Sequence, residues 1–237
     1  MTDFTVWDQL LRHYVDPQGR VNYQDWQQQA QGELQNWLDR IQPPDDRQFA
    51  TEQQLAFWLN LYNALTIRQV LQQYPIASIQ PKILGIPNWV GFLYFFVRPV
   101  YRLGAQHYSL NHIEHQIIRP QFQDPRIHFA LVCASVGCPL LRNEAYQPER
   151  LNHQLEEDAR RFINDPAKVR FDRQTQILYC SKIFQWYRPD FLQVAPSIPA
   201  YIQRYLNPFT LPSLSLSDTT VIRYLAYDWE LNDQINP

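Results

Sequence analysis

The sequence predicts an α+β domain in which helices pack on a small mixed or antiparallel sheet. Residues 51–73 repeat apolar side chains every three to four positions, which is the pattern of a helix in contact with a core. Two short runs around residues 169–179 have the composition of strands joined by a polar turn. Helical and strand patterns follow one another without regular strand–helix–strand alternation, so one α+β domain over residues 1–237 is favoured.

The N-terminal third is predicted to be helical. An amphipathic helix is expected at Phe4–Tyr14, followed by a turn at Asp16–Gly19 and a polar helix whose apolar stripe ends at Ile41. The strongest helix is expected at Thr51–Gln73, with Thr51 as its cap. Tyr74-Pro75 is expected to stop this helix, because the residue before proline is pushed out of the helical region.

The middle third is predicted to contain extended segments and one helix. Strands or extended segments are expected at Phe92–Val100 and Tyr101–Tyr108. Ser109 is the expected cap of a helix at Leu110–Arg119, and Pro120 is expected to mark its exit. The apolar run Ile127–Val132 lies between turn signals and predicts a buried strand.

The C-terminal third is predicted to mix both kinds of element. In chain order we expect a helix at Pro148–Asn164, a hairpin of Val169–Phe171 with Ile177–Tyr179, helical pieces at Ile183–Tyr187 and Ile198–Leu206, and a strand at Thr219–Tyr227.

Composition and charge favour a soluble intracellular protein with a small-molecule or peptide substrate. The net charge is −2 without a long basic block, so no nucleic-acid partner is expected. Three cysteines are few and odd in number, which suggests a reducing compartment, and the N-terminus shows no signal-peptide pattern. The most apolar stretch, Ile83–Tyr101, is interrupted by prolines and an arginine, so no integral membrane contact is expected. A cytoplasmic location follows, and the oligomeric state is left open.

The segment Arg126–Tyr146 holds the candidate nucleophiles. Cys138 is the first choice, because it precedes Pro139 at an expected helix start, where the helix dipole would favour a thiolate. Cys133 is the alternate, and Cys180 is expected to fill the core. The alternative for Cys138 is a small buried residue in a turn.

Histidines and an acidic residue complete the candidate site. His128 is the first-choice base and His115 its competitor, although His128 also suits a core position with its ring satisfied by a carbonyl. Glu114 lies in an apolar helix stripe, which predicts either a role in orienting His128 or a structural ion pair with Arg119, Arg126 or Arg142. No strong metal-ligand set is found: His112 and His115 are spaced for a shared face, but an isolated pair is weak.

Four further residues are candidates for substrate binding. Asn60 and Asn63 interrupt an apolar helix; either they satisfy buried backbone groups or one of them donates to an oxyanion. Arg126 and Arg142 have the donor geometry for a substrate carboxylate, or else form salt bridges inside the fold.

Four stretches together resemble a known family. They are AFWLNLYNALTI at Ala56–Ile67, YSLNHIEHQIIRPQF at Tyr108–Phe122, RIHFALVCASVGCPLLRNEAY at Arg126–Tyr146 and SKIFQWYRPDF at Ser181–Phe191. In this order they are similar to the successive motifs of the domain of unknown function 547 family, and HYVDPQGRVNY resembles its N-terminal segment. The resemblance places a family-like core at about residues 13–191, with a C-terminal extension, 192–237, packed on it. It implies a permuted papain-like or transglutaminase-like architecture.

These observations lead to two functional hypotheses. The first is a cysteine hydrolase or acyltransferase that cleaves an amide, of a small peptide or γ-glutamyl compound, with Cys138, His128 and Glu114 as its triad and the amides near Gly137 as oxyanion donors. Such chemistry requires no cofactor. The second is a non-catalytic interaction module that retains the motifs for folding.

Overall fold

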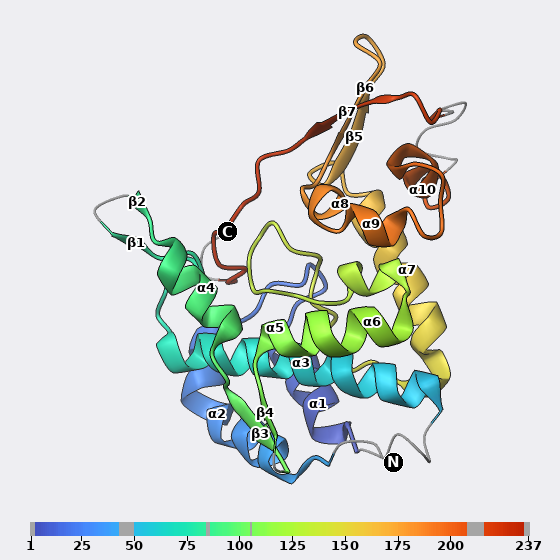
Figure 1. Cartoon of the computed structure of the whole chain (residues 1–237). Coiled ribbons are helices and arrows are strands. Elements are labelled where there is room, and N and C mark those ends of the chain that lie inside the picture. Colours follow the sequence, from blue (N-terminus) through green and yellow to red (C-terminus); the bar gives the residue numbers. More distant parts are fainter. Residues whose placement is uncertain (1–2, 43–49, 84–85, 105, 208–215, 235–237) are drawn as a thin grey trace.

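Three N-terminal helices form the base of the molecule. The structure, a computed structural model, describes residues 3–42, 50–83, 86–104, 106–207 and 216–234. Helices α1 (Thr5–Tyr14) and α2 (Tyr23–Arg40) pack below α3 (Thr51–Gln73), which crosses the middle of the molecule (Figure 1). The expected extents of α1 and α3 are confirmed. The α3 cap is Ala50 rather than Thr51, with Gln53 Oε1 accepting from the Ala50 N–H at 3.1 Å.

The first part of the middle third is helical where strands were expected. After the short hairpin β1 (Lys82–Ile83) and β2 (Ile86–Pro87), residues Trp89–Val97 form α4. The predicted strand Phe92–Val100 is therefore wrong. Asn88 caps the helix by accepting from the Gly91 N–H at 3.1 Å, a start signal that the aromatic content of the run obscured.

The expected extended segment Tyr101–Tyr108 is confirmed as a small hairpin. It consists of β3 (Tyr101–Leu103) and β4 (Gln106–Tyr108), in antiparallel register.

One helix then changes its winding along its length. It consists of α5 (Leu110–His112), a π-helical segment η1 (Ile113–Ile118) and α6 (Arg119–Phe122), and Ser109 caps it as expected. Pro120 lies inside the helix rather than at its exit. Because proline has no N–H and its ring would clash with the carbonyl four residues earlier, the wider π-turn is the accommodation expected just before it.

The segment predicted as the strand Ile127–Val132 is buried but is not a strand. Pro125–Phe129 forms a 3₁₀ turn, η2, and an irregular loop follows. Asn63 takes the place of a neighbouring strand: its Nδ2 donates to Ala130 O at 2.9 Å, and its Oδ1 accepts from the Val132 N–H at 3.0 Å. An apolar run of this length does not distinguish a strand from any other fully buried segment.

The C-terminal part carries a mixed three-stranded sheet with helices beside it. β5 and β6 are antiparallel, and β7 adds to β6 in parallel, pairing Ile177 with Val221. The predicted hairpin is confirmed, and the predicted last strand shortens to β7. The elements are η3 (Pro148–Arg150), α7 (Leu151–Ile163), β5 (Val169–Asp172), β6 (Ile177–Cys180), α8 (Ile183–Trp186), α9 (Arg188–Phe191), α10 (Ile198–Gln203) and β7 (Val221–Tyr224). The fold is α+β, as expected.

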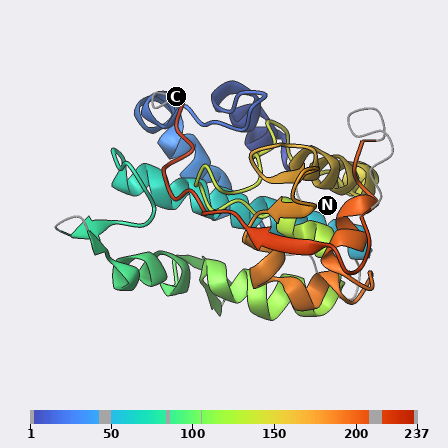
Figure 2. The ribbon, with the colours of Figure 1, turned by 90° about the horizontal axis from the view of Figure 1, so that it is seen from above.

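The chain beyond β7 returns across the molecule to the N-terminal helices (Figure 2). Leu231 N–H donates to Ala77 O at 2.9 Å, and the Tyr23 hydroxyl donates to Asn232 at 2.8 Å. One apolar cluster surrounds α1–α3, and a second lies between α7, α8, α10 and the sheet. Phe129 belongs to the second cluster and Ala130 to the first, so the loop that follows η2 begins where the two meet. No helix in the described part of the chain is both long and apolar enough to span a bilayer.

Candidate active site

A cavity of about 480 Å³ lies between α3, α4, the π-helical turn, α8 and the returning C-terminal segment. Its size is in the range of small-molecule sites. Five of the candidate catalytic side chains line it together: Glu114, His115, His128, Cys133 and Cys138. Residues that were chosen from two separate motifs therefore meet at one place.

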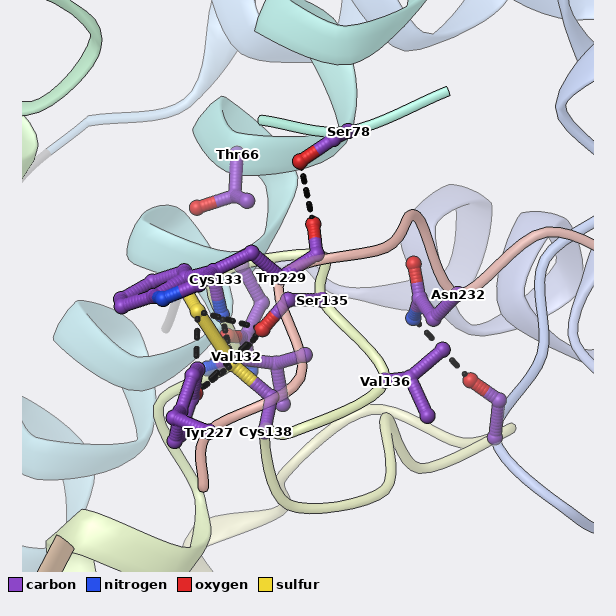
Figure 3. The surroundings of a disulfide bond; sticks show 12 residues. Thr66, Ser78, Val132, Cys133, Ser135, Val136, Cys138, Tyr227, Trp229 and Asn232 are labelled. Atoms are coloured by element: carbon purple, nitrogen blue, oxygen red, sulfur yellow. Dashed lines mark hydrogen bonds between the residues drawn. A yellow bond between two sulfur atoms is a disulfide. The ribbon is translucent and has the colours of Figure 1, made fainter. Parts of the chain in front are cut away.

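The two candidate nucleophiles are joined by a disulfide bond between Cys133 and Cys138 (Figure 3). Three donors approach Cys138 Sγ: the Cys133 N–H at 3.0 Å, the Tyr227 hydroxyl at 3.2 Å and the Ser135 hydroxyl at 3.5 Å. Hydrogen bonds to sulfur stabilise a thiolate more than a thiol, which is the environment that a thiol nucleophile requires.

The loop between the cysteines is tightly constrained. Ala134 has φ 64°, a left-handed conformation that a residue with a side chain adopts at some cost in energy. A Cβ on Gly137 would lie 2.6 Å from Asp228 O, so only glycine allows the returning chain to approach this closely. The loop and the C-terminal segment thus fix each other and place both sulfurs in the cavity.

Two expectations about Cys138 are wrong. No helix begins at Pro139, because the chain from Cys138 to Arg142 is irregular, so no helix dipole acts on the sulfur. The backbone N–H groups expected to bind an oxyanion are engaged within the protein: Gly137 N–H donates to Asp228 O at 2.8 Å, and Cys138 N–H donates to Ser135 O at 3.0 Å.

His128 is buried and is held by Asp190 rather than by Glu114. Its Nε2 lies 2.7 Å from Asp190 Oδ2, and its ring stacks on Tyr187 with centroids 3.8 Å apart. Burial lowers the pKa of His128 below its ordinary value of 6.5, more than Asp190 raises it, so the ring is neutral near pH 7. A neutral imidazole can accept a proton, as a general base must.

Asp190 is fixed in its ionised form. Arg119 binds both of its oxygens, with Nε at 2.8 Å and Nη2 at 2.9 Å. Burial alone would raise the pKa of Asp190, yet the hydrogen bonds from His128 and Arg119 hold it well below its ordinary value. An ionised carboxylate only accepts hydrogen bonds, so Nε2 of His128 carries the proton and Nδ1 is the basic nitrogen.

Glu114 reaches the cavity from the π-helical turn. Its carboxylate accepts from the Tyr187 hydroxyl at 2.5 Å and from the Tyr62 hydroxyl at 3.2 Å. Burial, and then the Glu114 charge, raise the pKa values of both tyrosines well above their ordinary value, so both remain donors. Neither the expected role of orienting His128 nor the alternative ion pair with Arg119, Arg126 or Arg142 is found. Single π-turns inside α-helices occur frequently at functional sites.

His115 lies at the edge of the cavity. Its Nδ1 contacts Arg119 Nη1 at 2.8 Å, and its Nε2 lies 3.8 Å from Glu114 Oε1. The side chain is 38% exposed, so it is placed to meet a ligand from solvent rather than to act beside the buried sulfurs.

The predicted substrate-binding arginines lie elsewhere. Arg142 is 9% exposed and binds Glu144, Glu157 and Asp158 at 2.7, 2.8 and 2.9 Å. Arg126 binds Asp124 at 2.7 Å. Neither lines the cavity. Both arginines therefore form salt bridges inside the fold, which was the alternative interpretation. The expectation of an anionic substrate rested on these arginines and loses that support.

The asparagines also serve the fold. Asn60 Nδ2 donates to Tyr146 O at 2.8 Å, and its Oδ1 accepts from the Tyr146 N–H at 2.9 Å, while Asn63 holds the loop after η2. Cys180 is fully buried, and burial raises the pKa of its thiol to about 12, as suits a core residue. Within the described ranges, no group of three or more His, Cys, Asp and Glu side chains is placed to share a metal ion.

Three residues that contact the candidate catalytic side chains were not predicted as catalytic or substrate-binding residues. Asp190 and Tyr187 both belong to SKIFQWYRPDF, and a charged residue in an aromatic segment was the signal that could have indicated Asp190. Tyr227 lies in the C-terminal extension, where no local pattern marks it. Its contact with Cys138 spans 89 residues of sequence.

Residues 47–163 match the family model described as "Protein of unknown function, DUF547", which confirms the resemblance found in the sequence. No curated protein matches the chain, and no solved structure matches it. The matched range contains Glu114, His128 and both bonded cysteines, whereas Asp190 and Tyr227 follow it. The permuted papain-like architecture stays a prediction.

Proposed function

We propose that this chain, whose residues 47–163 match the DUF547 family, is a cysteine hydrolase or acyltransferase that cleaves an amide bond when its Cys133–Cys138 disulfide is reduced. One observation carries the proposal: three hydrogen-bond donors converge on Cys138 Sγ in a cavity that the neutral His128 also lines. A stabilised sulfur anion and a buried base are the two parts that thiol catalysis requires.

The reaction begins with reduction by a thiol reductant, which gives two electrons and two protons to the disulfide and is itself oxidised to a disulfide. His128 Nδ1 then accepts the proton of Cys138, and the thiolate attacks the substrate carbonyl carbon to form a C–S bond. The C–N bond breaks as His128 returns the proton to the leaving amine. Water, or a second nucleophile in acyl transfer, gives its proton to His128 and attacks the thioester carbon. The C–S bond breaks, and His128 returns the proton to the Cys138 sulfur.

Asp190 and Arg119 are positioning residues in this scheme. Asp190 keeps the His128 proton on Nε2, and Arg119 keeps Asp190 ionised. In this proposal Cys138, His128 and Asp190 form the triad, with Asp190 in the role that was predicted for Glu114. In a catalytic triad the carboxylate binds the imidazole nitrogen that does not face the nucleophile. Asp190 would have that position here.

The two remaining polar groups in the cavity suit the substrate amide. The Tyr227 hydroxyl, 3.2 Å from Cys138 Sγ, is a donor for the carbonyl oxygen as negative charge develops on it. Glu114 is an acceptor for the amide N–H, because its carboxylate lies in the cavity. Among the described residues it binds two hydroxyl donors, at 2.5 and 3.2 Å, besides its longer approach to His115, so it has capacity for another donor.

The test is the alkylation rate of each cysteine in the reduced protein. After reduction and removal of the reductant, iodoacetamide labelling near neutral pH is resolved by peptide mass. Cys138 is expected to label fastest and Cys180 not at all in the folded protein. His128→Ala should slow Cys138 strongly, whereas His153→Ala, which removes a 69% exposed histidine of α7, should not.

The result also decides between the two hypotheses for the chain. Fast labelling at Cys133 would move the nucleophile to that residue. If no cysteine of the folded, reduced protein reacts faster than a free thiol, the hydrolase proposal fails and the non-catalytic interaction module is the better account.

A further inference from the structure

The outer half of the cavity is walled by apolar side chains. Helix α4 presents one face to it, formed by residues at the i, i+3, i+4, i+7 and i+8 spacing: Trp89, Phe92, Leu93, Phe96 and Val97. In most helices this stripe faces the protein core. Here it lines a cavity and is partly open to water, with Leu93 and Trp89 each 56% exposed.

A second wall of aromatic rings leads from α4 to the sulfurs. Phe92 contacts Trp229 with centroids 4.7 Å apart, and Trp229 contacts Tyr227 at 4.3 Å. Trp186 packs on both Tyr227 and Trp229, at 4.8 and 5.9 Å. Because the Tyr227 hydroxyl lies 3.2 Å from Cys138 Sγ, the apolar surface is continuous from the mouth of the cavity to the reacting atom.

Charged groups are scarce along this path. Among the described residues that line the cavity there is a lysine, Lys182, but no arginine. A substrate that fills the outer half must therefore be apolar over most of its length, with its polar group at the inner end near Glu114, His128 and Cys138. An anionic peptide or γ-glutamyl group does not fit these walls.

We infer that the apolar outer half of the cavity is an acyl-binding subsite and that the substrate is an amide of a hydrocarbon-chain carboxylic acid. The inference rests on the proposed function for the position of the reacting carbonyl. The chain lies between α4 and the wall of Trp186 and Trp229, which places the carbonyl carbon beside Cys138. A single chain is favoured over a flat lipid surface, because the apolar residues enclose a cavity that leads inward to the sulfur.

Binding is tested first on the oxidised protein, which cannot cleave an amide through sulfur. The probes are N-hexanoyl-, N-octanoyl- and N-decanoylglycine, and the readout is tryptophan fluorescence. Each added methylene is expected to tighten binding about fourfold, the ratio for burying one methylene group. Leu93→Glu places a carboxylate in the wall and is expected to weaken N-decanoylglycine binding about tenfold or more. Val90→Glu is the matched control: it adds the same charge to the same helix at a 78% exposed position that does not line the cavity.

Turnover is measured separately, as glycine released by the reduced protein. Length-dependent binding without glycine release refutes the proposed hydrolase and keeps the acyl subsite. Glycine release from the amides without any dependence on chain length refutes the subsite and keeps the hydrolase. Equal losses in Leu93→Glu and Val90→Glu also refute the subsite. Binding to phosphatidylcholine vesicles that both variants weaken equally refutes the subsite as well, because α4 would then bind a lipid surface rather than a single chain.

Discussion

Asp190 Oδ2 lies 2.7 Å from His128 Nε2, and His128 lines the cavity that also contains the two bonded cysteines. Asp190 is ionised and bound by Arg119, so it accepts a hydrogen bond from the ring and has no proton to donate. This contact fixes Nδ1 as the basic nitrogen of His128.

Asp190→Asn should slow Cys138 alkylation in the reduced protein. An asparagine amide can present its NH₂ group to His128, which reverses the tautomer and removes the basic Nδ1. We expect the rate of amide cleavage to fall about a hundredfold, the typical contribution of a positioned base. Asp218→Asn, an exposed change beside Ser197, is the control and should leave both rates unchanged.

The pH dependence of Cys138 alkylation should show an acid limb below pH 6.5. Burial lowers the pKa of His128 below that ordinary value, so the ring stays neutral until the pH falls beneath it. The rate should therefore rise with pH through this limb. A pH–rate profile of the reduced protein measures it, and a limb above pH 6.5 that disappears in His128→Ala would contradict the assignment.

Tyr227→Phe should raise the pKa of the Cys138 thiol. The substitution removes one of three donors to the sulfur and keeps the ring that packs on Trp229. A hydrogen bond to a charged group is worth enough to slow alkylation about tenfold near neutral pH. Thiolate absorbance against pH provides the measurement. Tyr224→Phe on β7 is the control, because it removes the same hydroxyl group at a position away from the sulfur. An equal pKa shift in that variant would contradict the contact between Tyr227 and Cys138.

Arg142→Met should destabilise the protein without a specific effect on the site. The substitution removes one of the two arginines that bind Asp158, which is 2% exposed: Arg142 at 2.9 Å is lost and Arg161 at 2.6 Å remains. Removing one partner of a buried ion pair costs up to about 3–5 kcal/mol of unfolding free energy, and the remaining arginine reduces that loss. Urea unfolding measures this loss. A variant of unchanged stability but weaker substrate binding would restore the substrate role expected from the sequence.

Acid should unfold the protein through Glu144 and Asp190. Burial alone would raise the pKa of Glu144, but the hydrogen bond from Arg142 holds it at about 2, below its ordinary 4.5. A lowered pKa gives stability that is complete above the unfolded-state value and is lost as the pH falls from 4.5 toward 2. Glu144→Gln should flatten this dependence in urea titrations across the range, whereas the exposed Glu149→Gln should not.

The sequence indicated which residues line the candidate site better than it indicated which residues they contact. Glu114, His128 and the two cysteines carry local signals, because a charge, an imidazole or a thiol in an apolar run is unusual wherever the run folds. Asp190 and Tyr227 contact them across 62 and 89 residues, and such pairings depend on tertiary packing that no local pattern contains.

Elements were predicted well where caps and periodicity agreed. The helix at Thr51–Gln73 has both a regular apolar repeat and a proline stop, and its extent is as expected. The runs Phe92–Val100 and Ile127–Val132 contain too few polar positions to show a period. The first proved to be largely a capped helix whose apolar residues are partly exposed, so its hydrophobicity did not indicate a strand. The second is a 3₁₀ turn with a loop, because burial on several sides erases the alternation that identifies a strand.

The C-terminal segment that completes the cavity is synthesised after the other residues that line it. A ribosome delivers Glu114, His128, Cys138 and Asp190 before it adds Tyr227 and Trp229, which form the last wall of the cavity. Until then the sulfur lacks one of its donors, and the apolar channel lacks part of its second wall. A chain released before Trp229 would therefore contain the candidate reactive groups without the complete cavity that surrounds them.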